Sequence, residues 1–93
     1  MFIFLLFACA SNIQENCSLN MIFYDTDQLE FQTNISIGDT CFESEDERDT
    51  VLNKACADAV RSLEEEGFVE VSCDWDCTLL KEGFDATSEC LGI

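Results

Sequence analysis

Cysteines are the residues of this 93-residue chain whose type and number most clearly predict chemistry. Six of them lie beyond the apolar amino terminus, at Cys17, Cys41, Cys56, Cys73, Cys77 and Cys90. An even number of cysteines in a short secreted chain is typical of a disulfide framework. Zinc binding is the competing use, but the chain has no histidine and no Cys-x-x-Cys pair. The sequence therefore predicts three disulfides and leaves their pairing open.

The acidic side chains are the second candidate set. The chain has 20 Asp and Glu against four Lys and Arg, a net charge of −16. Such a balance repels nucleic acid and anionic membrane surfaces and favours basic partners. We therefore expect a basic extracellular protein as partner, no nucleic acid, no membrane insertion, and a monomeric chain.

Two acidic groups are candidates for binding that partner. The first lies at the end of a predicted helix, where the helix dipole disfavours anions, and the second is a row on the outer face of a predicted strand. Trp75, within that row, is either core against the helix or an exposed anchor. The candidate partner-binding residues are Glu64, Glu65, Glu66, Glu70, Asp74, Trp75 and Asp76.

Catalytic and metal-binding patterns are weak in this chain. Without histidine there is no serine or cysteine triad of the usual kind, and glycine is too sparse for a phosphate-binding loop. Asp25, Asp27 and Glu30 resemble the start of a calcium loop, but the sixth loop position is not glycine and Ser36 replaces the usual final Glu. We expect no enzymatic activity, no cofactor and no dedicated metal site.

Asn34-Ile35-Ser36 forms an N-glycosylation sequon. Apolar residues alternate over 29–37, and this alternation places Asn34 on the outward face of the expected strand. The sequence therefore predicts a glycan at Asn34.

The apolar run 1–10 is predicted to be a signal peptide. Ala8 and Ala10 supply the small residues before a cleavage site, and the run is too short to span a bilayer. Cleavage after Ala10 would remove Cys9, which makes the cysteine count even and leaves one secreted domain over 11–93. A buried strand is one alternative, and a lipidated Cys9 in a bacterial lipobox is another.

A hairpin is expected first in that domain. Apolar residues alternate over 19–24 and again over 29–37, with a turn signal at 25–27 between them. Gly38 is expected to end the second strand.

One helix follows, predicted over 45–66. Ser44 and Glu47 form a capping box at its start, and Gly67 suits the left-handed position after its end. Cys56 lies in the middle of the apolar stripe, so its disulfide partner should come from the sheet beneath.

Two more strands are expected after the helix. Residues 69–79 alternate without a break, although a short helix over 73–82 is a rival interpretation. After a turn at 81–83, residues 84–90 alternate again. The prediction is a small disulfide-rich α+β domain in ββαββ order, an antiparallel sheet with one helix packed on it.

In composition the chain resembles the small cysteine-rich proteins that parasites and venomous animals secrete from salivary or venom glands. That resemblance implies a secreted effector that sequesters or blocks a basic extracellular protein, such as a cytokine or chemokine, a protease or a channel. A secreted signalling ligand of pheromone or hormone type is one alternative. A protease inhibitor is another, with Lys81 in the expected 80–83 turn as its reactive residue.

Overall fold

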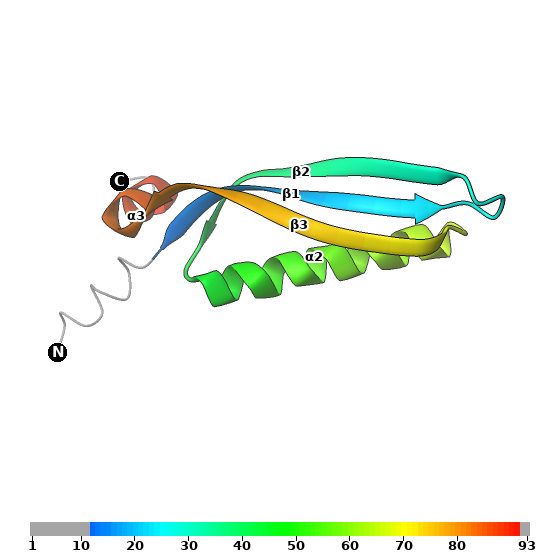
Figure 1. The fold of residues 1–93 in the computed structure, drawn as a ribbon. Helices are drawn as coiled ribbons and strands as arrows, with labels where there is room; N and C mark the ends of the chain where they lie inside the picture. Colours follow the sequence, from blue (N-terminus) through cyan, green and yellow to red (C-terminus); the bar gives the residue numbers. More distant parts are fainter. Residues whose placement is uncertain (1–11, 92–93) are drawn as a thin grey trace.

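The computed structural model describes residues 12–91, so the predicted signal peptide over 1–10 lies outside the described residues. The elements in chain order are β1 (Ile13–Tyr24), β2 (Glu30–Phe42), α2 (Glu45–Glu65), β3 (Val69–Glu82) and α3 (Gly83–Leu91). The strands form one antiparallel sheet in the order β2-β1-β3. Figure 1 shows α2 running along one face of this long sheet and α3 at the end where the chain terminates.

The hairpin is confirmed, but both of its strands are longer than expected: β1 begins at Ile13 instead of residue 19, and β2 continues to Phe42. In the turn, Asp25 Oδ1 accepts hydrogen bonds from the amides of Asp27 (2.8 Å) and Leu29 (2.9 Å). The prediction that Gly38 ends the strand was wrong. Gly38 has a φ of 86° and lies opposite Cys17, where the register between β1 and β2 shifts. Glycine adopts this conformation without steric cost, so the strand continues through a bulge.

Helix α2 begins and ends close to the predicted positions. Ser44 Oγ accepts from the Glu47 amide at 3.1 Å, and Glu47 Oε1 accepts from the amide of Glu43. At the other end Gly67 has a φ of 103°, and its amide donates to Glu64 O at 3.0 Å. The capping box and the glycine stop therefore define this helix as the sequence indicates.

Residues 69–79 form a strand as predicted, so the rival helix over 73–82 was wrong. Cys73 lies opposite Met21, and Cys77 lies opposite Cys17. The strand continues through the expected 81–83 turn to Glu82. Lys81 is therefore part of a strand, and the turn on which it was expected as an inhibitor residue is not there.

The expected strand over 84–90 is instead the helix α3, which changes the order to ββαβα. Only four alternating positions indicated a strand there, too few to separate period two from helical spacing. In the helix, Ala86 is fully buried, and Thr87 Oγ1 donates to Gly83 O at 3.0 Å. The coarser prediction, a small disulfide-rich α+β fold with an antiparallel sheet, is confirmed.

Three disulfides are confirmed, and each joins two different elements. Cys17–Cys77 links β1 to β3, Cys41–Cys90 links β2 to α3, and Cys56–Cys73 links α2 to β3. The last bridge matches the expectation that Cys56 pairs with the sheet. The core around them is small and centres on Cys17, Phe42 and Leu52. Crosslinks are the usual supplement where so little apolar surface is buried.

Candidate partner-binding surface

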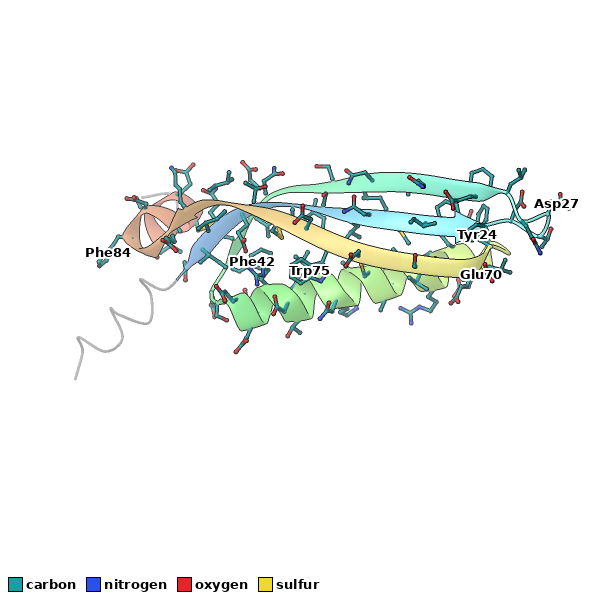
Figure 2. All side chains as sticks on the ribbon, viewed as in Figure 1. Tyr24, Asp27, Phe42, Glu70, Trp75 and Phe84 are labelled. Atoms are coloured by element: carbon teal, nitrogen blue, oxygen red, sulfur yellow. A yellow bond between two sulfur atoms is a disulfide. The ribbon has the colours of Figure 1, made fainter. Side chains whose placement is uncertain are left out.

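The two faces of the sheet differ sharply in composition. Side chains alternate between the faces of a strand, so every second residue of β1 points toward α2. From Glu15 to Phe23 those residues, among them Leu19 and Met21, are buried. Their neighbours Asn20 and Ile22 are exposed on the opposite side, which we call the open face. The open face comprises the alternate β1 residues Asn16, Ser18, Asn20, Ile22 and Tyr24, together with the residues paired with them in β2 and β3 (Figure 2).

Between β1 and β2 the open face is held by polar cross-strand contacts. Asn16 Nδ2 donates to Asp39 Oδ1 at 2.7 Å, and Tyr24 donates its hydroxyl to Glu30 Oε1 at 2.8 Å. The hydrogen bond from Tyr24 lowers the pKa of Glu30, and the same bond together with the Glu30 charge raises the pKa of Tyr24. Both acids therefore have hydrogen-bond donors within the protein, but the donors are neutral and leave the two negative charges uncompensated.

The β3 side of the open face carries acids without partners. Asp74 lies opposite Asn20, and Asp76 lies opposite Ser18. Both are exposed, and within the described part of the chain their carboxylates make no hydrogen bond or ion pair. Two unpaired carboxylates thus stand two residues apart on one strand.

All four basic side chains of the protein form ion pairs elsewhere. Three are on α2 and one is at the α3 end of the sheet. The pairs are Arg48 with Glu15 (3.1 Å) and Asp49 (2.9 Å), Lys54 with Asp58 (3.0 Å), Arg61 with Asp58, and Lys81 with Glu89 (3.3 Å). The open face from Asn16 to Tyr24 therefore has acidic and neutral side chains, among them the apolar Ile22, and no basic side chain.

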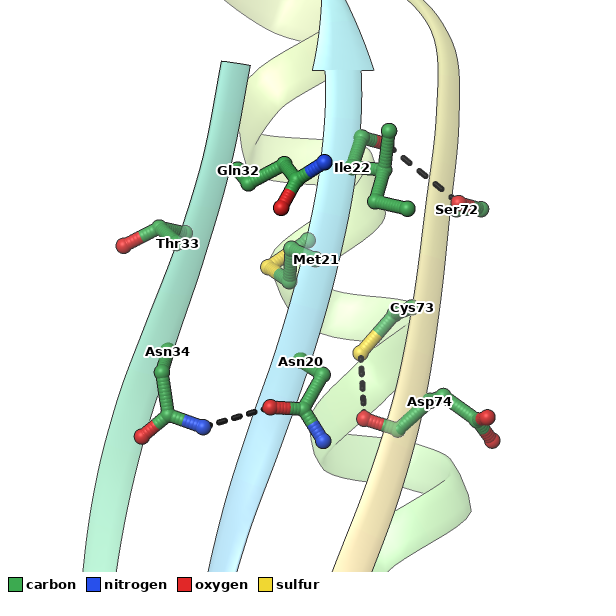
Figure 3. Close-up of a pocket in the computed structure, with 9 residues that line it drawn as sticks. All are labelled: Asn20, Met21, Ile22, Gln32, Thr33, Asn34, Ser72, Cys73 and Asp74. Atoms are coloured by element: carbon green, nitrogen blue, oxygen red, sulfur yellow. Dashed lines mark hydrogen bonds between the residues drawn. The ribbon is translucent and has the colours of Figure 1, made fainter.

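A shallow cavity of about 590 Å³ lies on this face. Figure 3 shows it across all three strands, with the helix behind the sheet. Its open-face lining residues are Asn20, Ile22, Gln32, Asn34, Ser72 and Asp74. Three amides, one hydroxyl and one carboxylate line it beside the apolar Ile22, and the polar groups are suited to hydrogen bonding with a polar or cationic surface. Within residues 12–91 no three potential ligands cluster in a way that would hold a metal ion.

The structure separates the predicted acidic partner-binding residues into three places. Asp74 and Asp76 share the open face. Glu70 lies at a bulge in β3, with a φ of 51°, at the end of the sheet near Tyr24 (Figure 2). The exposed Glu64, Glu65 and Glu66 end α2, on another element.

Trp75 lies on the opposite side of β3 from Asp74 and Asp76. Its Nε1 donates to Asn53 Oδ1 at 2.8 Å, and the ring packs against the core cluster. The Arg48 guanidinium lies 5.3 Å from the ring centroid. Trp75 therefore packs between the sheet and the helix, and it does not lie on the same surface as Asp74 and Asp76.

Sequence reasoning missed the ion pair that connects α2 to β1. Glu15 is only 4 % exposed, and Arg48 Nη1 donates to both of its carboxylate oxygens. The available signal was the phase of β1, which places Glu15 on the apolar face beside Cys17. A buried acid in that position needs a cation, and Arg48 in the first turns of the helix supplies it.

The remaining sequence motifs lie at the surface. Asn34 is exposed on the open face, and its Nδ2, the atom a glycan would join, donates to Asn20 Oδ1. In the calcium-like segment, one Asp25 oxygen already accepts two backbone amides, and Glu30 is engaged by Tyr24.

Comparison with known proteins returned no matching family model, no matching curated protein and no matching solved structure. None of the helices within 12–91 is long and apolar enough to cross a membrane.

Proposed function

We propose that this chain is an extracellular binding protein that attaches to a basic protein through the open face of its sheet. The observation that carries the proposal is that two open-face carboxylates lack partners while the basic side chains are all paired. Asp74 and Asp76 have none among the described residues, whereas every basic side chain is already ion-paired. The unsatisfied negative charge is therefore directed outward.

Charge favours this mode of binding in two ways. Asp74 and Asp76 repel one another on one face of a strand, and an arginine or lysine from a partner would relieve that repulsion. The net charge of −16 also attracts a basic protein before contact. Such steering raises association rates by roughly 10- to 1,000-fold and weakens with added salt.

Three disulfides support an extracellular setting, because such bonds persist in oxidising compartments. In that setting the protein acts by occupying a partner's surface, as a secreted effector of salivary or venom type would. Basic cytokines or chemokines, proteases and channels have the required chemistry. A signalling ligand for a receptor of the same species remains the alternative prediction.

A capture experiment with matched variants tests the proposal. The oxidised chain is immobilised beside an open-face variant, Asp74→Asn with Asp76→Asn, and a helix-end variant, Glu64→Gln with Glu65→Gln. Both variants lose two charges, so a difference between them reports position and not total charge. Extracellular fluid is passed over each chain. Bound protein is then released by raising the salt concentration from about 0.15 M to about 1 M, which shortens the electrostatic screening length from about 8 Å to about 3 Å.

We expect the unmodified chain and the helix-end variant to retain the same basic protein and the open-face variant to lose it. Retention of proteins that are not basic would contradict the proposal. Equal retention by all three chains would contradict it as well, because Asp74 and Asp76 would then play no part.

A further inference from the structure

Strand β2 presents a free edge to solvent. It pairs with β1 on one side only, and in the sheet order it is an outer strand. Residues 30–37 are all exposed. The backbone amides and carbonyls along the outer side of such a strand are available to pair with another extended chain.

The other outer strand, β3, is protected in ways that β2 is not. The middle of β3 carries the charges of Asp74 and Asp76, and charged edge residues disfavour the addition of a strand. Helix α2 also lies mainly beneath β3 (Figure 1). In contrast, residues 31–37 of β2 contain no charged residue, although the chain has 20 acids. The two edges of the sheet are therefore not equivalent.

An apolar strip follows the β2 edge on the side of α2. Phe31, Ile35 and Ile37 are 41 %, 43 % and 37 % exposed because the helix does not extend far beneath their strand. The three share one face by strand alternation and are continuous with the ring cluster of Phe23, Phe31 and Phe68. A strand added at this edge would cover the strip with every second side chain.

Acids stand at both ends of the same edge, on the open face. Glu30 lies opposite Tyr24, and Asp39 lies opposite Asn16. With one bulge residue between them, they are eight ladder positions apart, about 27 Å at about 3.4 Å per residue. Between them Gln32, Asn34 and Ser36 present neutral polar groups.

We infer that β2 receives an extended segment of the basic partner as a fourth strand of the sheet. The segment places apolar residues at alternate positions over Phe31, Ile35 and Ile37, and basic residues opposite Glu30 and Asp39. This is the β-augmentation mode of recognition, in which the backbone supplies affinity and the alternate side chains supply specificity. The inference rests on the proposed function, because it specifies how the basic partner is held.

Charge disfavours a second copy of the chain as the occupant. Antiparallel self-pairing centred on Asn34 would place Glu30 of each copy opposite Asp39 of the other. Like charges directly opposite one another destabilise a strand pair. The added strand should therefore carry the opposite charge at its two ends.

A synthetic peptide that reproduces this pattern is the direct probe. In the capped peptide Lys-Val-Thr-Val-Ser-Val-Thr-Val-Lys, the valines alternate and the lysines match the spacing of Glu30 and Asp39. The first control, Val-Val-Lys-Thr-Thr-Ser-Lys-Val-Val, has the same composition without the alternation. The second replaces both lysines of the patterned peptide by glutamate. Binding is measured by titration, and hydrogen exchange identifies the amides that become protected.

We expect the patterned peptide to bind at least about tenfold more tightly than either control, since about 1.4 kcal/mol corresponds to a factor of ten. Protection should concentrate in residues 30–42. Ile35→Glu should weaken binding by about tenfold because it buries a charge in the apolar strip. Leu79→Glu, at a residue of similar exposure on β3, should change binding less than about twofold.

Three results would overturn strand addition. Equal binding of the patterned and rearranged peptides would show attraction by charge alone, and the proposed function would stand without this inference. Equal binding of the glutamate peptide would show that basic residues are irrelevant, which counts against both. A dimer of the chain in sedimentation equilibrium that Ile35→Glu dissociates would assign the edge to a second copy.

Discussion

The two faces of the sheet are built from alternate residues of the same strands, yet they carry different kinds of side chain. The face toward α2 holds buried Leu19 and Met21, the Cys17–Cys77 and Cys56–Cys73 bridges, and the buried Glu15 with its cation. The open face carries amides and carboxylates, two of them unpaired. The contacts that stabilise the fold are therefore concentrated on the face toward α2, and we propose that the charge contacts of recognition lie on the open face, so substitutions on the two faces should have separable effects.

The largest effect should come from the bridge between β1 and β3. Replacing Cys17 and Cys77 by serine opens a loop with a sequence separation of 60. We expect a loss of about 4 kcal/mol in the free energy of unfolding, since the unfolded chain regains its freedom. Trp75 is the only tryptophan, so its fluorescence during guanidinium unfolding gives the measurement directly.

Asn16→Ala with Thr78→Ala is the matched control for that pair. Asn16 and Thr78 lie opposite one another on the open face, one position from the bridge. Their replacement should cost less than about 1 kcal/mol. An equal loss from both pairs would contradict the division between the faces.

The next effect should come from Leu52, which is 1 % exposed at the centre of the core. Leu52→Ala should destabilise the protein by about 3 kcal/mol through lost burial and the cavity left behind. Val51, its exposed neighbour on α2, should tolerate alanine with a change of less than about 0.5 kcal/mol. Thermal or denaturant unfolding of the two variants tests this difference, and similar losses would show that Leu52 is not packed as the structure has it.

Arg48→Met should have a smaller effect, about 2 kcal/mol, because Glu15 would remain buried without its cation. The Arg48 side chain is partly exposed, which allows water to compensate in part. In a double-mutant cycle, adding Glu15→Gln should recover much of the loss. If the two substitutions were simply additive, the pair would not be coupled and the helix-side network would be incorrectly described.

The smallest effect concerns Tyr24 on the open face. The raised pKa of Tyr24 means that folding favours the protonated phenol. The stabilisation that Tyr24 contributes is therefore present at lower pH and is lost as the pH rises through the folded-state pKa of Tyr24. As the only tyrosine, it can be followed by tyrosinate absorbance, and its midpoint should lie above that of the unfolded chain. Glu30→Gln should lower the midpoint. An unchanged midpoint would show that the Tyr24–Glu30 hydrogen bond is not formed in solution.

Local signals in the sequence determined most of the framework. Alternation located β1, β2 and β3, and the Ser44–Glu47 box located α2. Two errors came from signals that have two physical meanings. A glycine such as Gly38 can indicate the end of a strand, but here it accommodates a bulge within the strand. Residues 84–90 alternate over too few positions to distinguish a strand from the helix α3.

The candidate surface was only partly predictable for a different reason. Alternation correctly placed Asp74 and Asp76 together, away from Trp75. The state of the four basic residues depends on tertiary contacts such as Arg48 with Glu15, which join positions 33 residues apart. The exposed strip on β2 likewise depends on where α2 lies across the sheet, and no local pattern encodes that position.

The salt dependence of affinity for the captured partner tests the central claim most directly. The dissociation constant is measured over a range of salt concentrations for the unmodified chain, the open-face variant and the helix-end variant. We predict a steep loss of affinity with salt for the unmodified chain and the helix-end variant, and a much shallower one after Asp74→Asn and Asp76→Asn. Identical slopes for the unmodified chain and the open-face variant would contradict the assignment of binding to the open face.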